Sequence, residues 1–317
     1  MVESDITGAA RLLAERHARH RAAQPLLSAR CEDREVTERL VTEAWKADDA
    51  SGAVAVADGR TVGFLLGAPK PSATWGANTW VESGGLALHP SADPEVMREL
   101  YALAAARWVD EGRRAHYVLV PAHDGALLRA WYRLGFGQQH AHGIRAVPHE
   151  PTPHSPGVTV RRAAPADIPV LARLDVELPA HQRRSPVFSA APVPTLEECA
   201  VDWEESFDDP DFAYLVAQLD GQVAGTAVCC ALEKSSMHRG PAAVEGAGYL
   251  GFAAVLPELR GRGVARSLCD AVLDWCREQG PTALVTDWRV TNLLSSRTWP
   301  ALGFEETFLR LHRVVGY

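Results

Sequence analysis

The stretch that decides the fold runs from Pro257 to Trp275 and reads "PELRGRGVARSLCDAVLDW". Two glycines and three arginines surround the start of a helical pattern that is apolar on one face, and a predicted strand ends just before them, at Val255. At a helix N-terminus the free N–H groups converge, glycines let a ligand approach the main chain, and the dipole favours negative charge. The turn Arg260-Gly261-Arg262-Gly263 therefore predicts a site for an anion such as a pyrophosphate.

The turn is neither of the two commonest phosphate loops. The pattern G-x-x-x-x-G-K-[ST] is absent, and G-x-G-x-x-G fails because Arg266 stands where a glycine is required. A nucleoside triphosphate or a dinucleotide is therefore not the expected ligand. The alternative that stays open here is that the glycines only shape a tight strand-to-helix turn and that the arginines are solvated.

The chain contains an internal repeat. "DGALLRAWYRLGF", Asp124 to Phe136, reads like "NLLSSRTWPALGF", Asn292 to Phe304, and the offset is 292 − 124 = 168. The same offset carries one apolar helix face onto another, with spacing i, i+4, i+7, i+8 in both. These faces are Val96, Leu100, Leu103 and Ala104, and Val264, Leu268, Ala271 and Val272. The chain is thus predicted to hold two copies of one α/β unit.

A proline-rich segment separates the copies. "PHEPTPHSPG", from 148 to 157, has four prolines and a glycine, which leaves little chance of a helix or a central strand. We expect an N-terminal domain at 1–150 and a C-terminal domain at 151–317. In the second, the pattern predicts two helices, a hairpin that turns at Asp220-Gly221, a strand, the long helix, and a further strand, helix and closing strand. The first copy begins with two helical patterns instead.

Composition limits the class of protein. The chain has 317 residues, 47% of them hydrophobic and 23% charged, with no apolar run long enough to span a membrane and a polar N-terminus. Six cysteines without a C-x-x-C pair predict neither disulfides nor a zinc site, so we expect a cytoplasmic protein. A formal charge of −8 does not favour nucleic acid or membrane partners and suits an amine-bearing small molecule. The oligomeric state is left open.

At this point the sequence resembles a known family. "RGRGVA" matches the R/Q-x-x-G-x-G/A signature of the GNAT acyltransferase superfamily, with Arg260, Gly263 and Ala265 on the fixed positions. The later segment resembles the superfamily's N-x-x-A/S-x-x-x-Y-x-x-x-G-F pattern at Asn292, Ser295, Gly303 and Phe304. The resemblance covers the whole second half and, more weakly, residues from about 50 to 147 of the first.

The resemblance implies an α/β fold of two tandem GNAT-like domains, each a twisted mixed sheet flanked by helices. It also implies coenzyme A as the ligand of the turn, held at the pyrophosphate by the amides of Arg260, Gly261, Arg262, Gly263, Val264 and Ala265. Ala254 and Val255 would pair with the pantetheine amides, and Asn292 and Ser295 would contact the arm. The implied activity is acyl-CoA-dependent N-acetylation of an amine-bearing small molecule, with acetyl-CoA as the expected donor and direct attack by the amine.

The first copy should not bind coenzyme A. At the offset of 168, Ala92, Asp93, Pro94 and Glu95 stand where the Arg-Gly-Arg-Gly turn lies in the second copy. Asp93 and Glu95 would repel a pyrophosphate, and Pro94 has no amide donor. Asp93 instead predicts a helix cap with Pro94 at the first helical position. We interpret this half as a degenerate copy that shapes the acceptor site, with a purely structural role as the alternative.

The catalytic groups are less clearly marked. Family members use a tyrosine acid, but Trp299 stands at its place. Asp287 and Glu245 are the candidate bases, expected near splayed strand ends, and Tyr249 is a candidate acid. Each has an ordinary alternative: Asp287 as a cap of the next turn, Glu245 as an exposed loop carboxylate, and Tyr249 as core packing.

Other reactive side chains are not assigned to the reaction. Cys269 and Cys276 share the apolar side of the long helix and are expected in the core. His140 and His142 lie on one side of a strand without a third ligand nearby in sequence, so no metal is expected.

Two functions of other classes stay open. A non-catalytic module that senses acyl-CoA is favoured by Trp299 at the acid position. A transferase that uses an aminoacyl-tRNA donor would need a basic groove, which the charge balance does not indicate.

Overall fold

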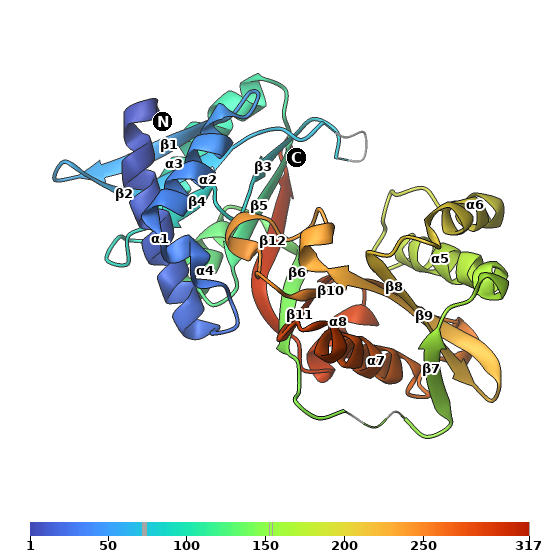
Figure 1. Ribbon diagram of the computed structural model, residues 1–317. Helices are drawn as coiled ribbons and strands as arrows, with labels where there is room; N and C mark the ends of the chain where they lie inside the picture. Colours follow the sequence, from blue (N-terminus) through green and yellow to red (C-terminus); the bar gives the residue numbers. More distant parts are fainter. Residues whose placement is uncertain (72–74, 152, 154, 317) are drawn as a thin grey trace. The chain divides into compact units, whose positions relative to one another are not determined.

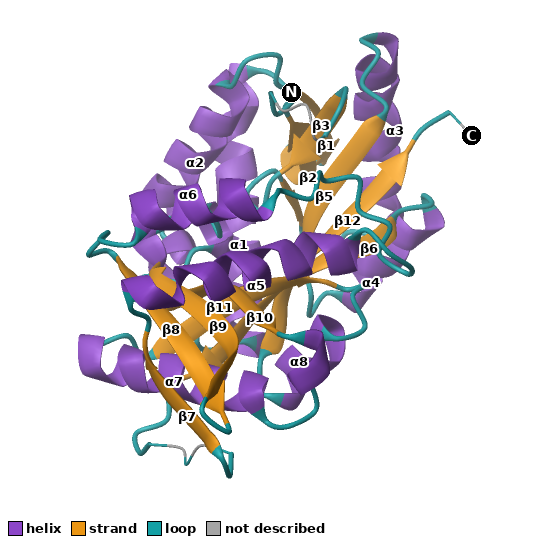
Figure 2. Cartoon of the chain, turned by 90° about the vertical axis from the view of Figure 1, so that its right-hand side faces the viewer, coloured by secondary structure: helices purple, strands orange, loops and turns teal. Residues whose placement is uncertain are grey.

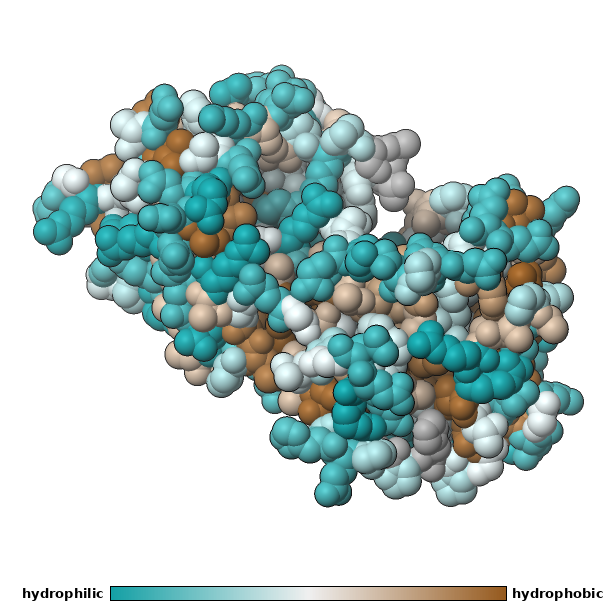
Figure 3. Space-filling model, viewed as in Figure 1, coloured by the Kyte–Doolittle hydropathy of each residue, from teal (hydrophilic) through white to brown (hydrophobic). Residues whose placement is uncertain are grey.

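The fold is described from a computed structural model, which covers residues 1–71, 75–151, 153 and 155–316. Contacts divide the chain into two compact units (Figure 1). Unit 1 comprises Met1–His142, His238–Val244 and Glu306–Tyr317, and unit 2 comprises Gly143–Met237 and Glu245–Glu305. On the face drawn in Figure 3, hydrophilic side chains predominate and apolar ones form separate patches. None of the helices within the described ranges combines the length and apolar character needed to cross a membrane.

Unit 1 has two groups of strands. Its elements are α1 (Ile6–Ala23), α2 (Arg34–Lys46), β1 (Ser51–Ala57), β2 (Arg60–Gly67), β3 (Asn78–Val81), β4 (Leu86–Leu88), α3 (Glu95–Asp110), β5 (Ala115–Pro121), α4 (Gly125–Arg133) and β6 (Gly137–Ala146). Strands β1, β2 and β4 form an antiparallel sheet, while β3 pairs parallel with β5. As the sequence predicts, this copy begins with two helices.

Unit 2 is built on five neighbouring strands in the order β11-β10-β9-β8-β7. Its elements are β7 (Val158–Arg162), α5 (Ile168–Gln182), α6 (Leu196–Ser206), β8 (Phe212–Leu219), β9 (Gln222–Ala231), β10 (Gly248–Val255), α7 (Val264–Gln279), β11 (Ala283–Arg289) and α8 (Ser295–Ala301). The strand that follows is β12 (Glu305–Val314), of which only Glu305 falls in unit 2. Figure 2 shows α5 and α6 on one face of these strands and α7 and α8 on the other. The hairpin predicted at Asp220-Gly221 joins β8 to β9, and both turn residues have positive φ.

The repeat is visible in the elements themselves. Moving β5 by 168 residues gives the bounds of β11, and moving β6 by 168 gives those of β12. Upstream the offset is 162, because α1 begins at Ile6 and α5 at Ile168, and the hairpin turn at Asp58-Gly59 returns at Asp220-Gly221. The expected two-copy α/β fold is therefore confirmed.

The last strand of the second copy lies in the first unit. Residues Phe308–Val314 of β12 pair antiparallel with β5, from Pro121 back to Ala115. Conversely, β6 leaves unit 1 at His142, and its last four residues belong to unit 2. The two units are defined by packing contacts and do not coincide with the two sequence copies. They therefore do not test the boundary expected between residues 150 and 151, which stays a prediction.

Candidate functional site

Two neighbouring parallel strands of unit 2, β10 and β11, separate from each other along their length. β10 pairs with β11 only from Gly248 to Leu250, opposite Leu284 to Thr286. Beyond Leu250 it continues to Val255 while paired with β9 on its other edge, after a register shift at Gly251. We call this opening between β10 and β11 the splay.

The main chain of β10 alternates between the two edges of the strand. The N–H of Leu256 donates to the carbonyl of Ala224 at 2.9 Å, so Phe252 and Ala254 also belong to the hydrogen-bonded pairs with β9. The main-chain groups of Ala253 and Val255 therefore point into the splay. The sequence predicted Ala254 and Val255 for this role, but the main chain of Ala254 faces β9, and Ala253 takes its place because the shift at Gly251 decides which residues face the open edge.

The glycine turn follows the splay directly. Gly261 and Gly263 have φ of 76° and 83°, the left-handed region in which glycine is unstrained, and Gly263 is the N-cap of α7. The Arg260 N–H, which was expected among the pyrophosphate donors, instead donates to the Pro257 carbonyl at 3.4 Å, whereas within the described residues the N–H groups from 261 to 263 donate no backbone hydrogen bond. The first helical bond of α7 runs from Ser267 N–H to the Gly263 carbonyl, which leaves the amides from 264 to 266 without helical acceptors. These N–H groups suit an anion.

The two glycines have different surroundings. A Cβ on Gly263 would lie 2.4 Å from the hydroxyl oxygen of Ser155, and that hydroxyl donates to the Gly263 carbonyl at 3.3 Å. The N–H of Ser155 also donates to the Ser267 hydroxyl at 2.9 Å. A Cβ on Gly261 would meet nothing within 4 Å. Gly263 is thus fixed by packing, whereas Gly261 leaves open space for a ligand.

The arginine side chains of the turn are tied to the protein. Arg260 Nε donates to the Val255 carbonyl at 3.1 Å, and its Nη2 lies 3.9 Å from Glu177. Arg262 forms an ion pair with Asp220 at 2.8 Å. The N–H groups of the main chain are therefore the donors still available to an anion, and the arginines add positive charge around them.

Two of the three predicted catalytic residues come together. The Tyr249 hydroxyl donates to Oδ2 of Asp287 at 3.0 Å, and Asp287 directly follows Thr286, the last residue of β11 paired with β10. Burial and the neighbouring carboxylate hold the pKa of Tyr249 well above its usual range, so Tyr249 keeps its proton. Glu245 is exposed in the turn before β10, at the end of the strand opposite the splay.

Helix α5 reaches both sides of the splay. Asn292 is 3% exposed, and its Oδ1 accepts from the Leu294 N–H and from Nε2 of His181, both at 3.1 Å. Ser295 donates to the Asn292 carbonyl. Glu177, one turn before His181, faces Arg260 on the β10 side. No local sequence pattern marks which helix crosses the splay, so the sequence alone does not place Glu177 or His181 there.

Trp299 and the cysteines have structural surroundings. The Trp299 ring is 9% exposed and packs edge-on against Phe304 at 5.7 Å, so this position supplies packing and no acidic proton. All six cysteines lie in the described ranges, are buried and form no disulfide. Burial raises the pKa of Cys269 and of Cys276 to about 12, so neither is a thiolate at neutral pH.

The candidate metal ligands lie in unit 1. The rings of His140 and His142 are 6.3 Å apart, and the His142 ring lies 4.2 Å from that of His238. Among the residues that the structure describes, no three His, Cys, Asp or Glu side chains are arranged to hold a metal ion.

The counterpart of the turn in unit 1 has acidic groups. Asp93 accepts a hydrogen bond from the Glu95 N–H at 2.9 Å, but α3 begins at Glu95 with Pro94 as its N-cap, so the helix starts one residue later than the expected placement of Asp93 as cap and Pro94 as first helical residue. Glu95 forms ion pairs with Arg98 and Arg133. This helix start therefore satisfies its own amide and presents carboxylates where unit 2 presents glycines.

Comparison with known proteins identifies the family. Residues 179–304 match the family described as "Acetyltransferase (GNAT) family". An aminoglycoside N(6')-acetyltransferase type 1 of Stenotrophomonas maltophilia is 30% identical over 152 residues, which are 47% of this chain and 87% of that relative. The chain belongs to the GNAT acetyltransferase family. The GNAT match spans the α5 end, the splay, the glycine turn and α8.

One further relative is matched over part of its length, and one solved structure is matched over nearly all of its length. N-alpha-acetyltransferase 30 of Schizosaccharomyces pombe is 30% identical over 104 residues, so the match spans 33% of this GNAT chain and 63% of that relative. A GCN5-related N-acetyltransferase from Sphaerobacter thermophilus superposes with a TM-score of 0.60 at 16% identity, covering 100% of this chain and 95% of that one. This likeness shows that the fold extends over both copies.

Proposed function

We propose that this protein is an N-acetyltransferase, in which unit 2 transfers an acyl group from acyl-CoA, with acetyl-CoA as the donor, to the amine of a small molecule. The observation that carries the proposal is the splay, which has an open glycine turn at one end and the Asp287 carboxylate at the other. The family membership supports the reaction class, since the relatives named above are acetyltransferases.

The residues present fit coenzyme A. The N–H groups from 261 to 266 would bind the pyrophosphate, and Gly261 leaves space for it. The main-chain edge of β10 that faces the splay, at Ala253 and Val255, would pair with the pantetheine amides, as a third strand would, although the Val255 carbonyl already accepts from Arg260 Nε. Asn292 and Ser295 would contact the arm from the start of α8.

Asp287 is the group proposed to accept the proton of the acceptor amine. The amine nitrogen attacks the thioester carbonyl, the C–S bond breaks, and the amine proton passes to Asp287, directly or through water. Tyr249 donates its hydrogen bond to this carboxylate and is therefore proposed as a positioning residue and not as the acid. Glu245 stays the second candidate base, and the geometry favours it less than Asp287 because it lies just before β10, at the end of the strand opposite the splay.

The leaving thiolate needs little help. A thiol has a pKa of about 8.5, so a thiolate leaves near neutral pH without a strong acid and can take its proton from water. Trp299 at the usual acid position is compatible with this step. No acyl-enzyme is proposed, because the buried thiols have raised pKa values, such as about 11 for Cys199 and Cys230.

The setting of the reaction follows from composition. The charge of −8 suits an acceptor that carries positive charge, a cytoplasmic location is proposed from the cysteine pattern, and no partner beyond donor and acceptor is needed. Unit 1 is proposed as the degenerate copy, because Asp93 and Glu95 replace the glycines of the turn.

Thiol release tests the proposal. The protein is incubated with acetyl-CoA and a panel of amines that includes an aminoglycoside, a polyamine and a peptide with a free N-terminus, and calorimetry measures coenzyme A binding in parallel. We expect binding together with thiol release on at least one amine. Binding without release on any amine would favour the acyl-CoA sensor. Absence of binding would reject the proposal and favour the aminoacyl-tRNA donor.

A further inference from the structure

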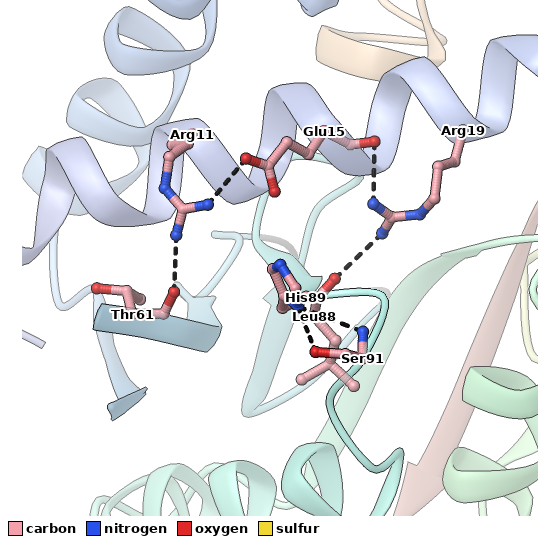
Figure 4. A network of polar contacts seen from close by, with 7 residues as sticks. All are labelled: Arg11, Glu15, Arg19, Thr61, Leu88, His89 and Ser91. Atoms are coloured by element: carbon pink, nitrogen blue, oxygen red, sulfur yellow. Dashed lines mark hydrogen bonds and ion pairs between the residues drawn. The ribbon is translucent and has the colours of Figure 1, made fainter. Parts of the chain in front are cut away.

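Two arginines of α1 bind main-chain carbonyls inside unit 1. Arg16 is 2% exposed and donates to the carbonyls of Ser83, at 2.6 Å, and Leu86, at 2.5 Å. Arg19 donates to the carbonyl of Leu88 at 3.1 Å, and Figure 4 shows it joining this carbonyl to the α1 main chain at Glu15. A buried guanidinium group is costly unless its donors are satisfied, so these carbonyls are integral to the packing of α1.

The carbonyls in question lie on one edge of β4. The N–H of Leu66 donates to the Gly85 carbonyl, and the N–H of His89 donates to the Val62 carbonyl. Residues 85, 87 and 89 therefore face β2, and the main-chain groups of Leu86 and Leu88 face the opposite edge. Arg16 and Arg19 occupy that edge.

This edge corresponds to the open edge of β10 in unit 2. Gly63 pairs with Leu88 and lies under Val96 and Leu100 of α3. Gly225 pairs with Val255 and lies under Val264 and Leu268 of α7, which are the same helix positions at the offset of 168. Leu88 thus matches Val255, and Leu86 matches Ala253.

The helices correspond as well. Each follows a three-residue 3₁₀ turn, Glu3–Asp5 before α1 and Pro165–Asp167 before α5. At their offset of 162, Leu178 stands at the position of Arg16, and His181 stands at that of Arg19. Leu178 is partly exposed, and within the described chain the Ala253 carbonyl accepts no side-chain hydrogen bond.

We infer that Arg16 and Arg19 close the copy of the donor groove in unit 1, and that Leu178 is the residue that leaves the groove open in unit 2. The second part rests on the proposed function. In unit 1 the guanidinium groups bind the carbonyls that the pantetheine amides would otherwise use. Displacing them would leave a buried charge unpartnered, which no neutral amide can offset. In unit 2 the leucine has no donor, so the Ala253 carbonyl stays open to a ligand, while the Val255 carbonyl accepts from Arg260 Nε of the glycine turn.

Transplanting the closing residue tests the inference. Leu178→Arg should bind the Ala253 edge and raise the dissociation constant of coenzyme A by at least about tenfold in calorimetry, because charged hydrogen bonds must be displaced. Val201→Arg on α6 is the matched control, since it adds the same charge at a 46% exposed position and should leave binding unchanged. Equal affinities of the two variants would overturn the role of Leu178. Two coenzyme A molecules per wild-type chain would overturn the closed groove.

A second variant separates this inference from the proposed function. Arg16→Met keeps most of the side-chain volume but leaves the Ser83 and Leu86 carbonyls without their donor, so the thermal midpoint should fall by several degrees. Arg107→Met, with a side chain 62% exposed on α3, is the control and should change the midpoint little. If Arg16→Met and the wild type have equal thermal midpoints, the closing role of Arg16 is overturned, whether or not the wild type binds coenzyme A. Failure of the wild type to bind coenzyme A would instead reject the proposed function.

Discussion

Gly261 offers the sharpest test of the anion site. Its φ of 76° is left-handed, and a Cβ there would meet no protein atom within 4 Å. Asparagine and aspartate have nearly the same shape, and both tolerate this backbone region better than other residues. Gly261→Asp and Gly261→Asn therefore differ mainly in one negative charge placed beside the N–H groups of the turn. The ratio of their dissociation constants for coenzyme A therefore reports the repulsion between this added charge and a bound anion.

The magnitude follows from Coulomb's law. With about 6 Å between the new carboxylate and a phosphate, and an effective dielectric constant of about 40, each pair of unit charges repels by about 1.4 kcal/mol. A pyrophosphate that carries two charges then loses about 1.4–3 kcal/mol, which raises the dissociation constant about 10- to 100-fold for Asp relative to Asn.

Calorimetry with coenzyme A at low and high salt reads out the effect. The difference between the two variants should shrink at high ionic strength, since the turn is exposed to screening. Equal dissociation constants at low salt would refute the assignment of the turn as a pyrophosphate site. A difference that does not respond to salt would indicate a backbone effect instead.

Two further predictions concern single side chains. Tyr249→Phe removes the 3.0 Å hydrogen bond to Asp287, so turnover should fall by roughly tenfold while coenzyme A affinity stays the same, and unchanged turnover would contradict its positioning role. His20 is buried, and desolvation, together with its positive neighbours, lowers its pKa from 6.5 to about 2. Below pH 6.5 the unfolded chain therefore binds a proton at this histidine that the folded chain does not bind, and the folded state loses stability as the pH falls. By pH 5.5 this loss should amount to roughly 1 kcal/mol, and urea unfolding of His20→Gln between pH 7.5 and 5.5 should show a weaker pH dependence than wild type; identical slopes would argue against the buried neutral histidine.

Local backbone chemistry made much of the fold predictable. Gly261 and Gly263 need positive φ, Asp220-Gly221 forms a hairpin turn, and Thr195 caps α6 with Glu198, so each signal lies within a few residues of its effect. The internal repeat could be recognised because the apolar residues of α3 and α7 keep the same spacing, as helices that pack in the same way must. The register shift at Gly251 left no local signal, so the choice of Ala253 over its neighbour could not be predicted.

Long-range pairing accounts for the rest. Tyr249 and Asp287 were both named, but their contact depends on the register of two parallel strands that are separated by α7 in the sequence. The offset changes from 168 to 162 toward the N-terminus, so Arg16 and Leu178 could not be matched from the later repeat alone. The pairing of β12 with β5 joins residues nearly two hundred positions apart, beyond any local pattern.

The central claim is that Asp287 in the splay of unit 2 serves acyl transfer from coenzyme A. The most direct measurement is thiol release by Asp287→Asn at saturating acetyl-CoA and an accepted amine, with coenzyme A affinity measured on the same sample. We predict a loss of turnover of about 10²- to 10⁴-fold with the affinity unchanged, as expected for removal of a general base. Turnover equal to that of the wild type would contradict the account.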